Sequence, residues 1–345
     1  MNIFLNDIDC KEHFLPFSHT RHVADIRIGI LTIRQKWELL LDGKGRMVDS
    51  LEGVEDAISI PANVIPTIEN VDEIIALSIS NKLVIESATI KIIYYPWHIF
   101  QLNDWSLRND FKLSTKGRSS ACIHASNYCS NLKDIFIEEG TQIKNCSLNA
   151  DNGPIYIGEN VQIMEGSLIR GPFSIGANSV VKMGSKIYGA TTVGPNCVVG
   201  GEIKNSILFE NSNKAHDGYI GDSVIGAWCN LGAGTSNSNI KNTGGNINYE
   251  LTENAIIKTD FNKGGLIMGD YSRSAINTSF NTATIVGVCC NVFGAGFPRK
   301  NVPNFTWGNE KYEFEKAIRD IDNWKKMKGV NITETEIEKL KNIYL

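Results

Sequence analysis

An aliphatic side chain recurs at every sixth position through the middle of this chain. The unbroken run comprises Ile157, Ile163, Ile169, Ile175, Val181, Ile187, Val193 and Val199. A period of six differs from the 3.6 residues of an α-helical turn and from the alternation of two along a simple strand. It is typical of hexapeptide repeats, in which each unit forms one flat face of a parallel β-helix and the repeated side chain stacks inside.

Small residues support this interpretation, because they recur four positions after most of the aliphatic ones: Ser167, Ser179, Ser185, Thr191 and Cys197. We expect Cys197 to act there as a small apolar filler. Two stretches interrupt the repeat. Residues 144–154 are predicted to form a loop that bulges from a corner. Residues 237–265, rich in Asn and Gly, are too long for a tight turn and are predicted to form a functional loop. The repeat then resumes at Met268, Ser274, Phe280, Val286 and Val292.

The patterns divide the chain into four predicted parts, and the fold class is α+β followed by β. Residues 1–95 are predicted to form a small α/β domain, 96–134 a helical connector, 135–300 the β-helix and 301–345 a C-terminal helical extension. Pro298 and Pro303 are expected to end the coil.

Local patterns predict the elements within these parts. Strands are expected at 1–5, 57–60, 74–77, 83–85 and 90–95, and a helix at 28–41. Near the C-terminus, Thr333 and Glu336 have the spacing of a capping box. That helix either covers the open strand edge of the coil, which would otherwise invite unwanted pairing, or lies loosely on the surface.

Composition narrows the class of protein. The net charge of −4 over 345 residues provides no basic field for nucleic acid. No run of 18 apolar residues predicts a membrane span, and the first residues lack the basic-then-apolar pattern of a signal peptide. Eight cysteines show no CxxC pair and no framework spacing. We therefore expect reduced thiols, a cytoplasmic location and no structural metal site.

One histidine, His216, lies inside the regular coil. Close after it, between Gly221 and Gly226, the repeat shortens from six residues to five. Such a slip redirects side chains at a corner, and departures from regularity often mark function. Imidazole is the natural general base near neutral pH. The alternative, a corner histidine satisfied by the backbone, stays open at this point.

The stretch 201–239 resembles the acetyltransferase domain of the bifunctional N-acetylglucosamine-1-phosphate uridylyltransferase/glucosamine-1-phosphate acetyltransferase family. The matching motifs are Glu-Ile-Lys at 202–204, His-x-x-Tyr at 216–219, the five-residue step, Asn-Leu-Gly-Ala-Gly-Thr at 230–235, and Asn239. This resemblance implies a left-handed β-helix, assembly as a homotrimer, and acetyl-CoA and an amino-sugar phosphate bound between neighbouring subunits.

The resemblance also implies roles for individual residues. His216 corresponds to the base that activates the sugar amine, while Lys204 and Tyr219 correspond to the residues that hold the sugar phosphate. Asn230 and Asn239 correspond to residues that orient the amino sugar, and the turn containing Ala233 and Gly234 meets the thioester. The family has Tyr-Asp after the second Asn, where this chain has Ile240 and Lys241. We expect Lys241 to replace that phosphate contact.

Residues 15–34 resemble a divergent group of sugar nucleotidyltransferase-like proteins from Bacteroidetes. The Gly-x-Gly-Thr-Arg-Met phosphate loop of such enzymes is absent, since Asn6–Cys10 stands in its place. Arg21, Asp25 and Arg27 are the candidate contacts for a nucleotide phosphate and Mg²⁺. The alternative is a domain that only stabilises the assembly.

Four functions are compared. The first is acetyl-CoA-dependent transfer to an amino-sugar phosphate in nucleotide-sugar biosynthesis. The second is a sugar-1-phosphate nucleotidyltransferase using UTP or dTTP, with the β-helix as a trimerisation scaffold. A β-helix carbonic anhydrase needs three histidine ligands for Zn²⁺, but only His124 and His216 lie in or near the coil. A non-catalytic scaffold is the fourth. The sequence favours the first, with the second as a possible additional activity.

Overall fold

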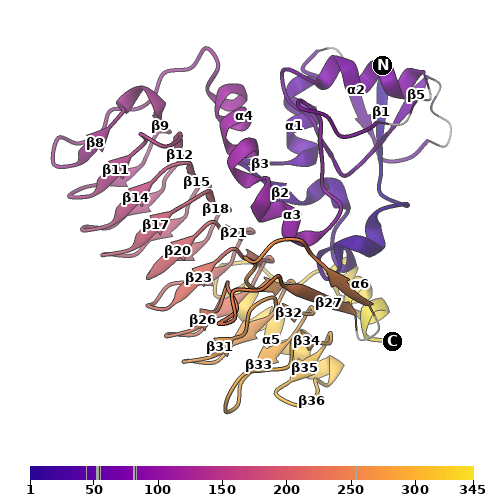
Figure 1. Cartoon of the computed structure of the whole chain (residues 1–345), viewed down its shortest axis with the longest axis vertical. Helices are drawn as coiled ribbons and strands as arrows, with labels where there is room; N and C mark the ends of the chain where they lie inside the picture. The colour runs from indigo at the N-terminus through magenta and orange to yellow at the C-terminus, as the bar shows by residue number, and fades with distance from the viewer. Residues whose placement is uncertain (44, 52–53, 55, 81, 83, 253–254) are drawn as a thin grey trace.

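Three parallel sheets wrap the middle of the chain into a three-sided coil (Figure 1). The computed structural model describes residues 1–345 except 44, 52–53, 55, 81, 83 and 253–254. The regular coils contribute one short strand to each sheet, and inward residues meet across coils, as in the column Ile157, Ile175 and Val193. These side chains are almost fully buried. The predicted parallel β-helix is therefore confirmed.

The strands of each face follow in chain order. The six-stranded face contains β8 (Tyr128–Ser130), β11 (Ser147–Asn149), β14 (Leu168–Arg170), β17 (Lys186–Tyr188), β20 (Glu202–Lys204) and β23 (Tyr219–Gly221). The nine-stranded face contains β9 (Ile135–Ile137), β12 (Ile155–Ile157), β15 (Phe173–Ile175), β18 (Thr191–Val193), β21 (Ile207–Leu208), β24 (Val224–Ile225), β29 (Ile267–Met268), β32 (Ile285–Val286) and β34 (Asn301–Val302).

The ten-stranded face contains β10 (Gln142–Ile143), β13 (Gln162–Ile163), β16 (Val180–Val181), β19 (Val198–Val199), β22 (Asn213–Lys214), β25 (Asn230–Leu231), β30 (Arg273–Ser274), β33 (Asn291–Val292), β35 (Thr306–Trp307) and β36 (Glu310–Lys311). A two-stranded sheet, β26 (Ser236–Asn237) with β31 (Ser279–Phe280), lies further along the same coils.

The coil extends beyond both boundaries predicted for it. It begins at β8, before residue 135, and includes β34 and β35, past residue 300. The expected loop at 144–154 contains β11, whose single inward side chain, Leu148, is fully buried. A three-residue strand shows too few apolar residues for the pattern to detect. Pro303 lies at a corner after β34, where no ladder hydrogen bond is lost, so it does not end the coil.

The N-terminal domain is built on β1 (Asn2–Asn6), which lies between β4 (Arg46–Val48) and β5 (Ala57–Pro61) in a parallel sheet. Two small antiparallel pairs accompany it, β2 (Arg27–Ile28) with β3 (Leu31–Thr32), and β6 (Val64–Ile65) with β7 (Lys91–Ile92). Its helices are α1 (Ile33–Leu40) and α2 (Val71–Ile79), and the connector forms α3 (Pro96–Gln101) and α4 (Asn103–Thr115). The small α/β domain is confirmed, and α3 and α4 occupy the first part of the segment predicted as a helical connector.

Several elements predicted in this domain were wrong in type or extent. Residues 74–77 belong to α2, because an apolar run looks the same in a buried helix as in a strand. The helix expected at 28–41 begins only at Ile33, after the β2–β3 turn, where Thr32 and Gln35 form a capping box. Only Lys91–Ile92 of the strand expected at 90–95 is paired. Of the strand expected at 83–85, residue 83 lies outside the described residues and the other two form no strand.

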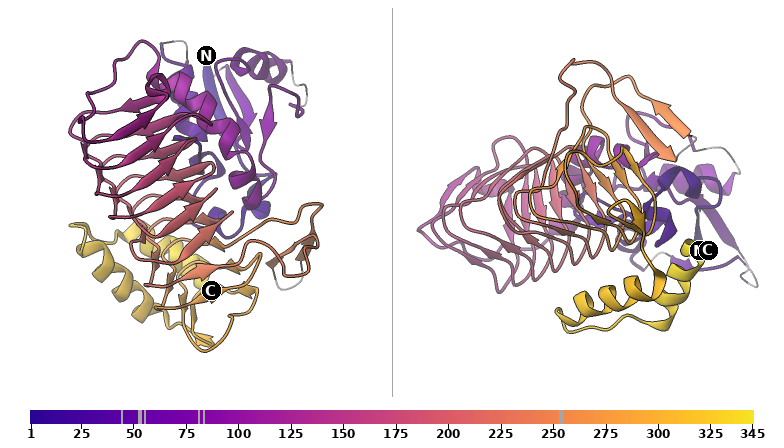
Figure 2. Two further views of the ribbon diagram at one scale, coloured as in Figure 1. Left: turned by 60° about the vertical axis from the view of Figure 1, so that its left-hand side comes forward. Right: turned by 90° about the horizontal axis from the view of Figure 1, so that it is seen from below.

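The C-terminal extension folds as α5 (Phe314–Lys326) and α6 (Glu334–Tyr344), and the predicted capping box begins α6. Both helices lie along the side of the coil (Figure 2). Trp324 of α5 contacts the Arg273 guanidinium on the ten-stranded face. The last parallel strand of that face, β35, is covered by the antiparallel strand β36. The helices therefore cover a face of the coil and do not close its end.

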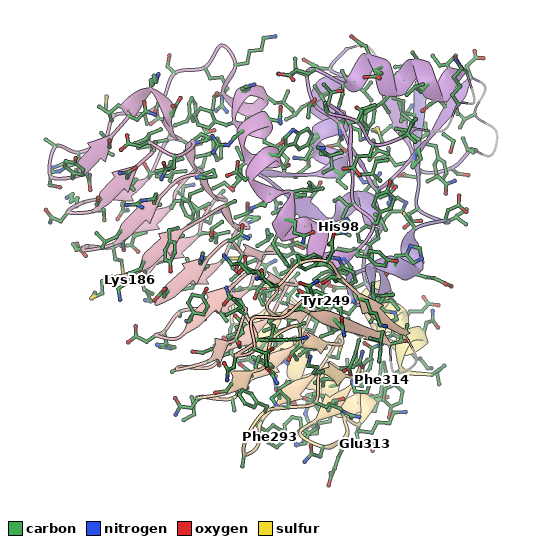
Figure 3. All side chains as sticks on the ribbon, viewed as in Figure 1. His98, Lys186, Tyr249, Phe293, Glu313 and Phe314 are labelled. Carbon is green, nitrogen blue, oxygen red and sulfur yellow. The ribbon has the colours of Figure 1, made fainter. Side chains whose placement is uncertain are left out.

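The interruption at 237–265 carries a hairpin of β27 (Asn248–Thr252) and β28 (Ala255–Lys258). Tyr249 of this hairpin is fully buried and stacks on Trp97 of α3, with ring centroids 4.4 Å apart (Figure 3). The hairpin thus packs the coil against the N-terminal region. Within the described part of the chain, no helix combines the length and apolar character needed to cross a membrane.

A buried polar network joins the β2–β3 turn to α4 and the coil. The ammonium group of Lys36 pairs with the Asp110 carboxylate and lies 3.0 Å from Ser106 Oγ. Asp110 also accepts from the backbone N–H of Ile30 at 2.8 Å. Asn103 donates to the carbonyl of Ala190 in the coil. Because the Lys36 side chain is completely buried, its charge depends on this carboxylate.

We expect Asp110→Asn to lower the free energy of unfolding by about 3–5 kcal/mol, because it leaves a buried ammonium without a counter-charge. Asp104→Asn, on the same helix, removes only the exposed pair with Arg108 and is expected to cost less than about 0.5 kcal/mol. Urea unfolding of both variants and the wild type measures the difference. Equal stabilities of the two variants would show that the Lys36 pair is not a structural determinant.

Candidate functional site

The coils are shorter in the region that carries the site predicted from the sequence. On the ten-stranded face, Val198 pairs with Val180, 18 residues earlier. The next step, to Asn213, is only 15 residues, and the step from there to Asn230 is 17. After the long insertion that follows Asn230, the step from Arg273 to Asn291 is again 18. Shortened corners move the backbone inward relative to their neighbours, so the site lies at a local break in the regularity of the prism.

His216 lies on the corner that joins β22 to β23, and its side chain is exposed. The preceding corner contains only Gly200 and Gly201. Both glycines press against the histidine turn: a Cβ at Gly200 would lie 2.3 Å from the Ala215 carbonyl oxygen, and one at Gly201 would lie 2.7 Å from that of His216. Larger residues would therefore displace the turn that carries the imidazole.

Lys214 fixes the same turn from inside the coil. It pairs in register with Val199, and it occupies the inward position with only 1% of its surface exposed. Its ammonium group donates to the carbonyl oxygens of Gly200, at 3.3 Å, and His216. Burial lowers the pKa of Lys214 to about 8. Sequence reasoning missed this role, although a lysine at an aliphatic beat position was a visible signal.

Tyr219 and Asn239 come together on the six-stranded side, and Lys204 lies on the neighbouring strand, in register with Gly221. Asn239 Nδ2 donates to Tyr219 Oη at 3.0 Å and to Asp222 Oδ2 at 2.5 Å. Asn205 Nδ2 donates to the other oxygen of Asp222 at 2.6 Å. Burial, with the nearby Asp222 charge, raises the pKa of Tyr219 above its ordinary value, so the phenol is a hydrogen-bond donor. Asp222, at the predicted five-residue step, is the positioning residue that sequence reasoning missed.

Gly221 is required for this arrangement, because the Tyr219 side chain lies over it. A Cβ at Gly221 would lie 2.2 Å from Tyr219 Oη. Lys204 forms no ion pair with any described residue, and its nearest aromatic contact is the Tyr188 ring, 5.9 Å from Nζ. The cluster therefore presents a half-buried phenol and an ammonium group that no carboxylate neutralises.

Ala233 and Gly234 form the next corner along the coil from His216. The Gly234 N–H donates to the Asp217 carbonyl at 2.9 Å, so the two corners are hydrogen-bonded neighbours. Asn230 is placed differently. It stands on the ten-stranded face beside Arg273, in a cavity covered by α5. Within one chain, the structure thus separates Asn230 from the Tyr219–Asn239 cluster.

Among the described residues, no hydrogen bond or ion pair joins Lys241 to the Tyr219–Asn239 cluster. Its ammonium group donates to the carbonyl oxygen of Asn246, within the segment that leads to the β27–β28 hairpin. Ile240, at the position where the resembled family has tyrosine, is 42% exposed.

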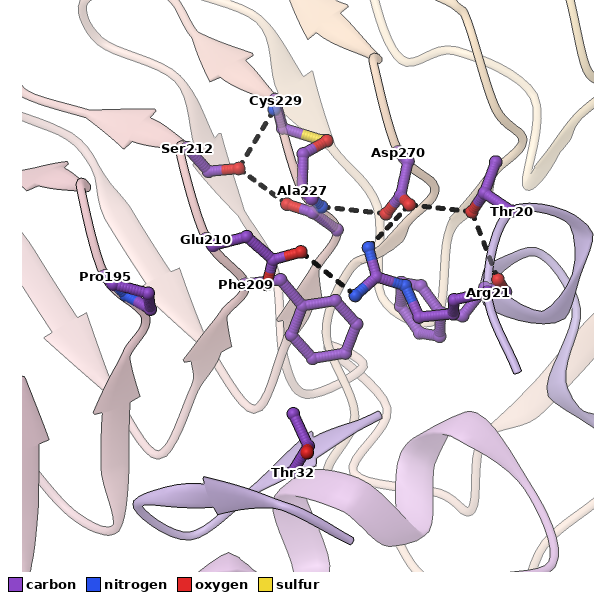
Figure 4. A network of polar contacts seen from close by, with 12 residues as sticks. Thr20, Arg21, Thr32, Pro195, Phe209, Glu210, Ser212, Ala227, Cys229 and Asp270 are labelled. Carbon is purple, nitrogen blue, oxygen red and sulfur yellow. Dashed lines mark hydrogen bonds and ion pairs between the residues drawn. The ribbon is translucent and has the colours of Figure 1, made fainter. Parts of the chain in front are cut away.

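Arg21, Asp25 and Arg27 line one cavity of about 540 Å³ between the N-terminal domain, the coil and α6. Arg21 is engaged by two coil carboxylates, with Asp270 Oδ2 at 2.6 Å and Glu210 Oε1 at 3.3 Å (Figure 4). Although burial opposes its charge, these carboxylates raise the pKa of Arg21. Thr20 adds a hydrogen bond to Asp270. Arg21 therefore joins the N-terminal domain to the coil by two ion pairs.

The other two residues of this predicted phosphate and Mg²⁺ site are also occupied. Asp25 Oδ1 accepts from Arg34 Nε at 2.6 Å, and its second oxygen accepts from the same guanidinium. Arg27 is 9% exposed and donates to the Ile30 carbonyl. Over the described residues, no group of three or more His, Cys, Asp or Glu side chains is gathered to hold a metal ion. The arrangement does not fit Mg²⁺ coordination by Asp25.

We expect Lys214→Met to remove one specific pH dependence of stability. The folded pKa of about 8 lies below the model-peptide value of 10.5, so between these values the unfolded chain binds more protons. The contribution of Lys214 to the free energy of unfolding therefore rises with pH from 8 to 10.5. Urea unfolding of wild type and variant at pH 7.5 and 10 tests this. A wild-type-minus-variant difference that does not change with pH contradicts it.

Residues 3–87 match a family model described as "Sugar nucleotidyl transferase". The chain is 36% identical over 86 residues to the "Bifunctional protein GlmU" of Methanococcus maripaludis strain C5, covering 25% of this chain and 20% of that protein. It is 27% identical over 209 residues to a "Bifunctional sugar-1-phosphate nucleotidylyltransferase/acetyltransferase" of Sulfurisphaera tokodaii, covering 60% of this chain and 45% of that protein.

The chain thus spans about one fifth of the length of the first of these relatives and less than half of the second. Among solved structures, a UDP-N-acetylglucosamine acyltransferase of Francisella novicida aligns with 66% of this chain and 78% of its own, at 16% identity and a TM-score of 0.38. Residues 3–87 are similar to sugar nucleotidyltransferases, and the sequence is similar to bifunctional nucleotidyl- and acetyltransferases.

Proposed function

We propose that this protein transfers an acetyl group from acetyl-CoA to the amine of an amino-sugar phosphate at the His216 corner, as a step in nucleotide-sugar biosynthesis. The observation that carries the proposal is the corner itself. An exposed imidazole stands on a backbone turn held by Gly200, Gly201 and the buried Lys214. It is adjacent to the Ala233–Gly234 corner and follows the shortened coil.

In the proposed reaction the imidazole of His216 accepts a proton from the sugar ammonium group. The free amine then attacks the thioester carbonyl and the carbon–sulfur bond breaks. The thiolate of CoA leaves and takes up the second proton that the nitrogen loses as the amide forms. The backbone N–H of Ala233 is the candidate to stabilise the oxyanion, because that of Gly234 already donates to the Asp217 carbonyl. Lys204, free of any described carboxylate, is suited to the sugar phosphate. The Tyr219 oxygen accepts from Asn239, which leaves the phenol's own proton to be donated to the substrate.

We propose that the protein is a homotrimer. Lys204, Tyr219 and Asn239 lie on one side of the coil, whereas Asn230 lies on the face covered by α5. A neighbouring subunit would supply the wall that a single flat face lacks. Light scattering of the purified protein should give three times the mass of one chain, and a monomer at micromolar concentration would contradict this assembly.

We expect His216→Ala to lower kcat/KM for acetyl transfer by about 10²–10⁴-fold, the usual contribution of a general base. His124→Ala is the matched control, because His124 is also an exposed histidine and lies near the first coil. Thiol release from acetyl-CoA, with glucosamine-1-phosphate and related amino sugars as acceptors, measures both. Full activity in the His216 variant would rule out the proposed base.

We expect Lys204→Gln to raise KM for the amino-sugar phosphate at least tenfold, because it removes the cation proposed to meet the phosphate. The KM for acetyl-CoA should not change. Lys186→Gln is the control, since Lys186 projects from the same sheet one coil earlier and pairs in register with Glu202 (Figure 3). Equal KM values for both variants would remove Lys204 from the site.

A sugar-1-phosphate nucleotidyltransferase using UTP or dTTP is the second candidate, and the family match of residues 3–87 favours it. The domain would use residues other than Arg21 and Asp25, whose charges are engaged by Asp270 and Arg34. Pyrophosphate release from UTP or dTTP with a sugar phosphate and Mg²⁺ would support this activity. Absence of nucleotide binding at millimolar concentration would exclude it.

A further inference from the structure

A second cavity lies between the ten-stranded face of the coil and α5. Its volume is about 370 Å³, and it is lined by Asn230, Arg273, Ser274, Ala275, Asn291, Val292, Phe293, Trp307, Asp320, Asn323 and Trp324. Aromatic walls with a few polar groups that converge on them are the usual composition of a small-molecule site. The acyl-transfer proposal makes no use of this cavity beyond Asn230.

Arg273 is the charged group on the wall of this cavity. It is only 7% exposed, and its Nε atom is buried without a hydrogen-bond partner among the described residues. No described carboxylate forms an ion pair with it. Burial lowers the pKa of Arg273, which means that the protein environment does not fully compensate the charge. The guanidinium rests on the Trp324 ring, 5.2 Å from its centroid.

A buried guanidinium without a partner is unfavourable, because removal from water is not offset by hydrogen bonds or an opposite charge. Such groups in native proteins call for an explanation. The Nε atoms of Arg21 and Arg27 are also buried without a partner among the described residues, but Arg27 donates through another guanidinium nitrogen to the Ile30 carbonyl. Arg21 has two carboxylates. Arg273 therefore differs from the other two buried arginines, and an external anion would supply the counter-charge that it lacks.

The remaining side chains that line the cavity favour a ligand that carries both a phosphate and an aromatic ring. Three carboxamides, those of Asn230, Asn291 and Asn323, offer donors around the guanidinium, which suits an anion with several oxygens. Phe293 and Trp307 form an edge-to-face pair, with centroids 5.5 Å apart, and Phe293 lies near the lower end of the coil (Figure 3).

One carboxylate also lines the cavity, that of Asp320. Its Oδ2 accepts from Tyr312 Oη at 2.5 Å, and its Oδ1 lies 3.7 Å from Arg319 Nε. These contacts hold the Asp320 carboxylate against Tyr312 and Arg319. It does not reach ion-pair distance of Arg273.

We propose that this cavity binds a nucleotide phosphate, with Arg273 paired to the phosphate and the base against the aromatic wall. Two sources share this chemistry: the nucleotide end of coenzyme A and a uridine nucleotide. The site is built by α5 and the coil of one chain, so it requires neither acyl transfer nor the His216 base.

The test measures direct binding of nucleotides to the 345-residue chain. Binding is monitored by tryptophan fluorescence and by the rise in melting temperature that a bound ligand causes. The probes are adenosine 3′,5′-bisphosphate, uridine 5′-monophosphate and inorganic phosphate. We expect one of the two nucleotides to bind saturably and at least tenfold more tightly than phosphate. Whichever nucleotide binds more tightly identifies the source.

Arg273→Gln should weaken binding of that nucleotide at least tenfold, and Arg273→Lys should restore part of the affinity. Arg319→Gln is the control, because its side chain is 68% exposed on the same helix. Without ligand, Arg273→Gln should melt at or above the wild-type temperature, since it removes a buried unpaired charge. Unchanged nucleotide affinity in Arg273→Gln, or no saturable binding to the wild type, overturns the proposal.

His216→Ala separates this proposal from the proposed function. The variant should bind the nucleotide as the wild type does, whether or not it transfers acetyl groups. Loss of nucleotide binding in His216→Ala would place the ligand at the His216 corner and overturn the Arg273 site. Full acetyl transfer in that variant would overturn only the proposed base.

Discussion

The inward stacking of one aliphatic side chain per face is the constraint on which the rest of this structure depends. Each strand of the coil has only two or three residues and cannot form a stable sheet alone, so its stability comes from the coils above and below. Because the backbone path is fixed by this stacking, a change of even one residue in coil length moves a corner. The shortened steps around Asn213 place the His216 turn in this way.

One corner column shows how the coil adapts to its neighbours. Where the nine-stranded face meets the ten-stranded face, successive coils place a residue at positive φ: Asn160, Asn178, Asn196 and Asn211, and then Trp228, Tyr271, Cys289 and Phe305. Asparagine tolerates this conformation, whereas bulky residues are strained in it. The bulky members begin where α5 and α6 pack. Tyr271 Oη, for example, is hydrogen-bonded to Glu336 at 2.9 Å. Packing against the helices offsets the backbone strain.

Much of the fold was predictable because single residues at a fixed spacing define its repeat. The site was predictable only in part. The five-residue step after Gly221 lies one corner beyond the His216 turn, and it holds Asp222, the carboxylate that accepts from Asn239. The pattern could not show that Arg21 is neutralised by Asp270, 249 residues away. Such pairings join side chains that are distant in sequence, and no local period records them.

The sequence by itself determined the parallel coil, the α/β region before it and the capped helix after it, because each follows from local spacing and short-range hydrogen bonds. The tertiary structure alone decided which charges remain available. Arg21 and Asp25 are held in ion pairs, whereas no carboxylate among the described residues pairs with Lys204 or Arg273. The physical reason is that electrostatic compensation depends on distance in space, which the chain sets only once the N-terminal domain, the coil and α5 are packed together.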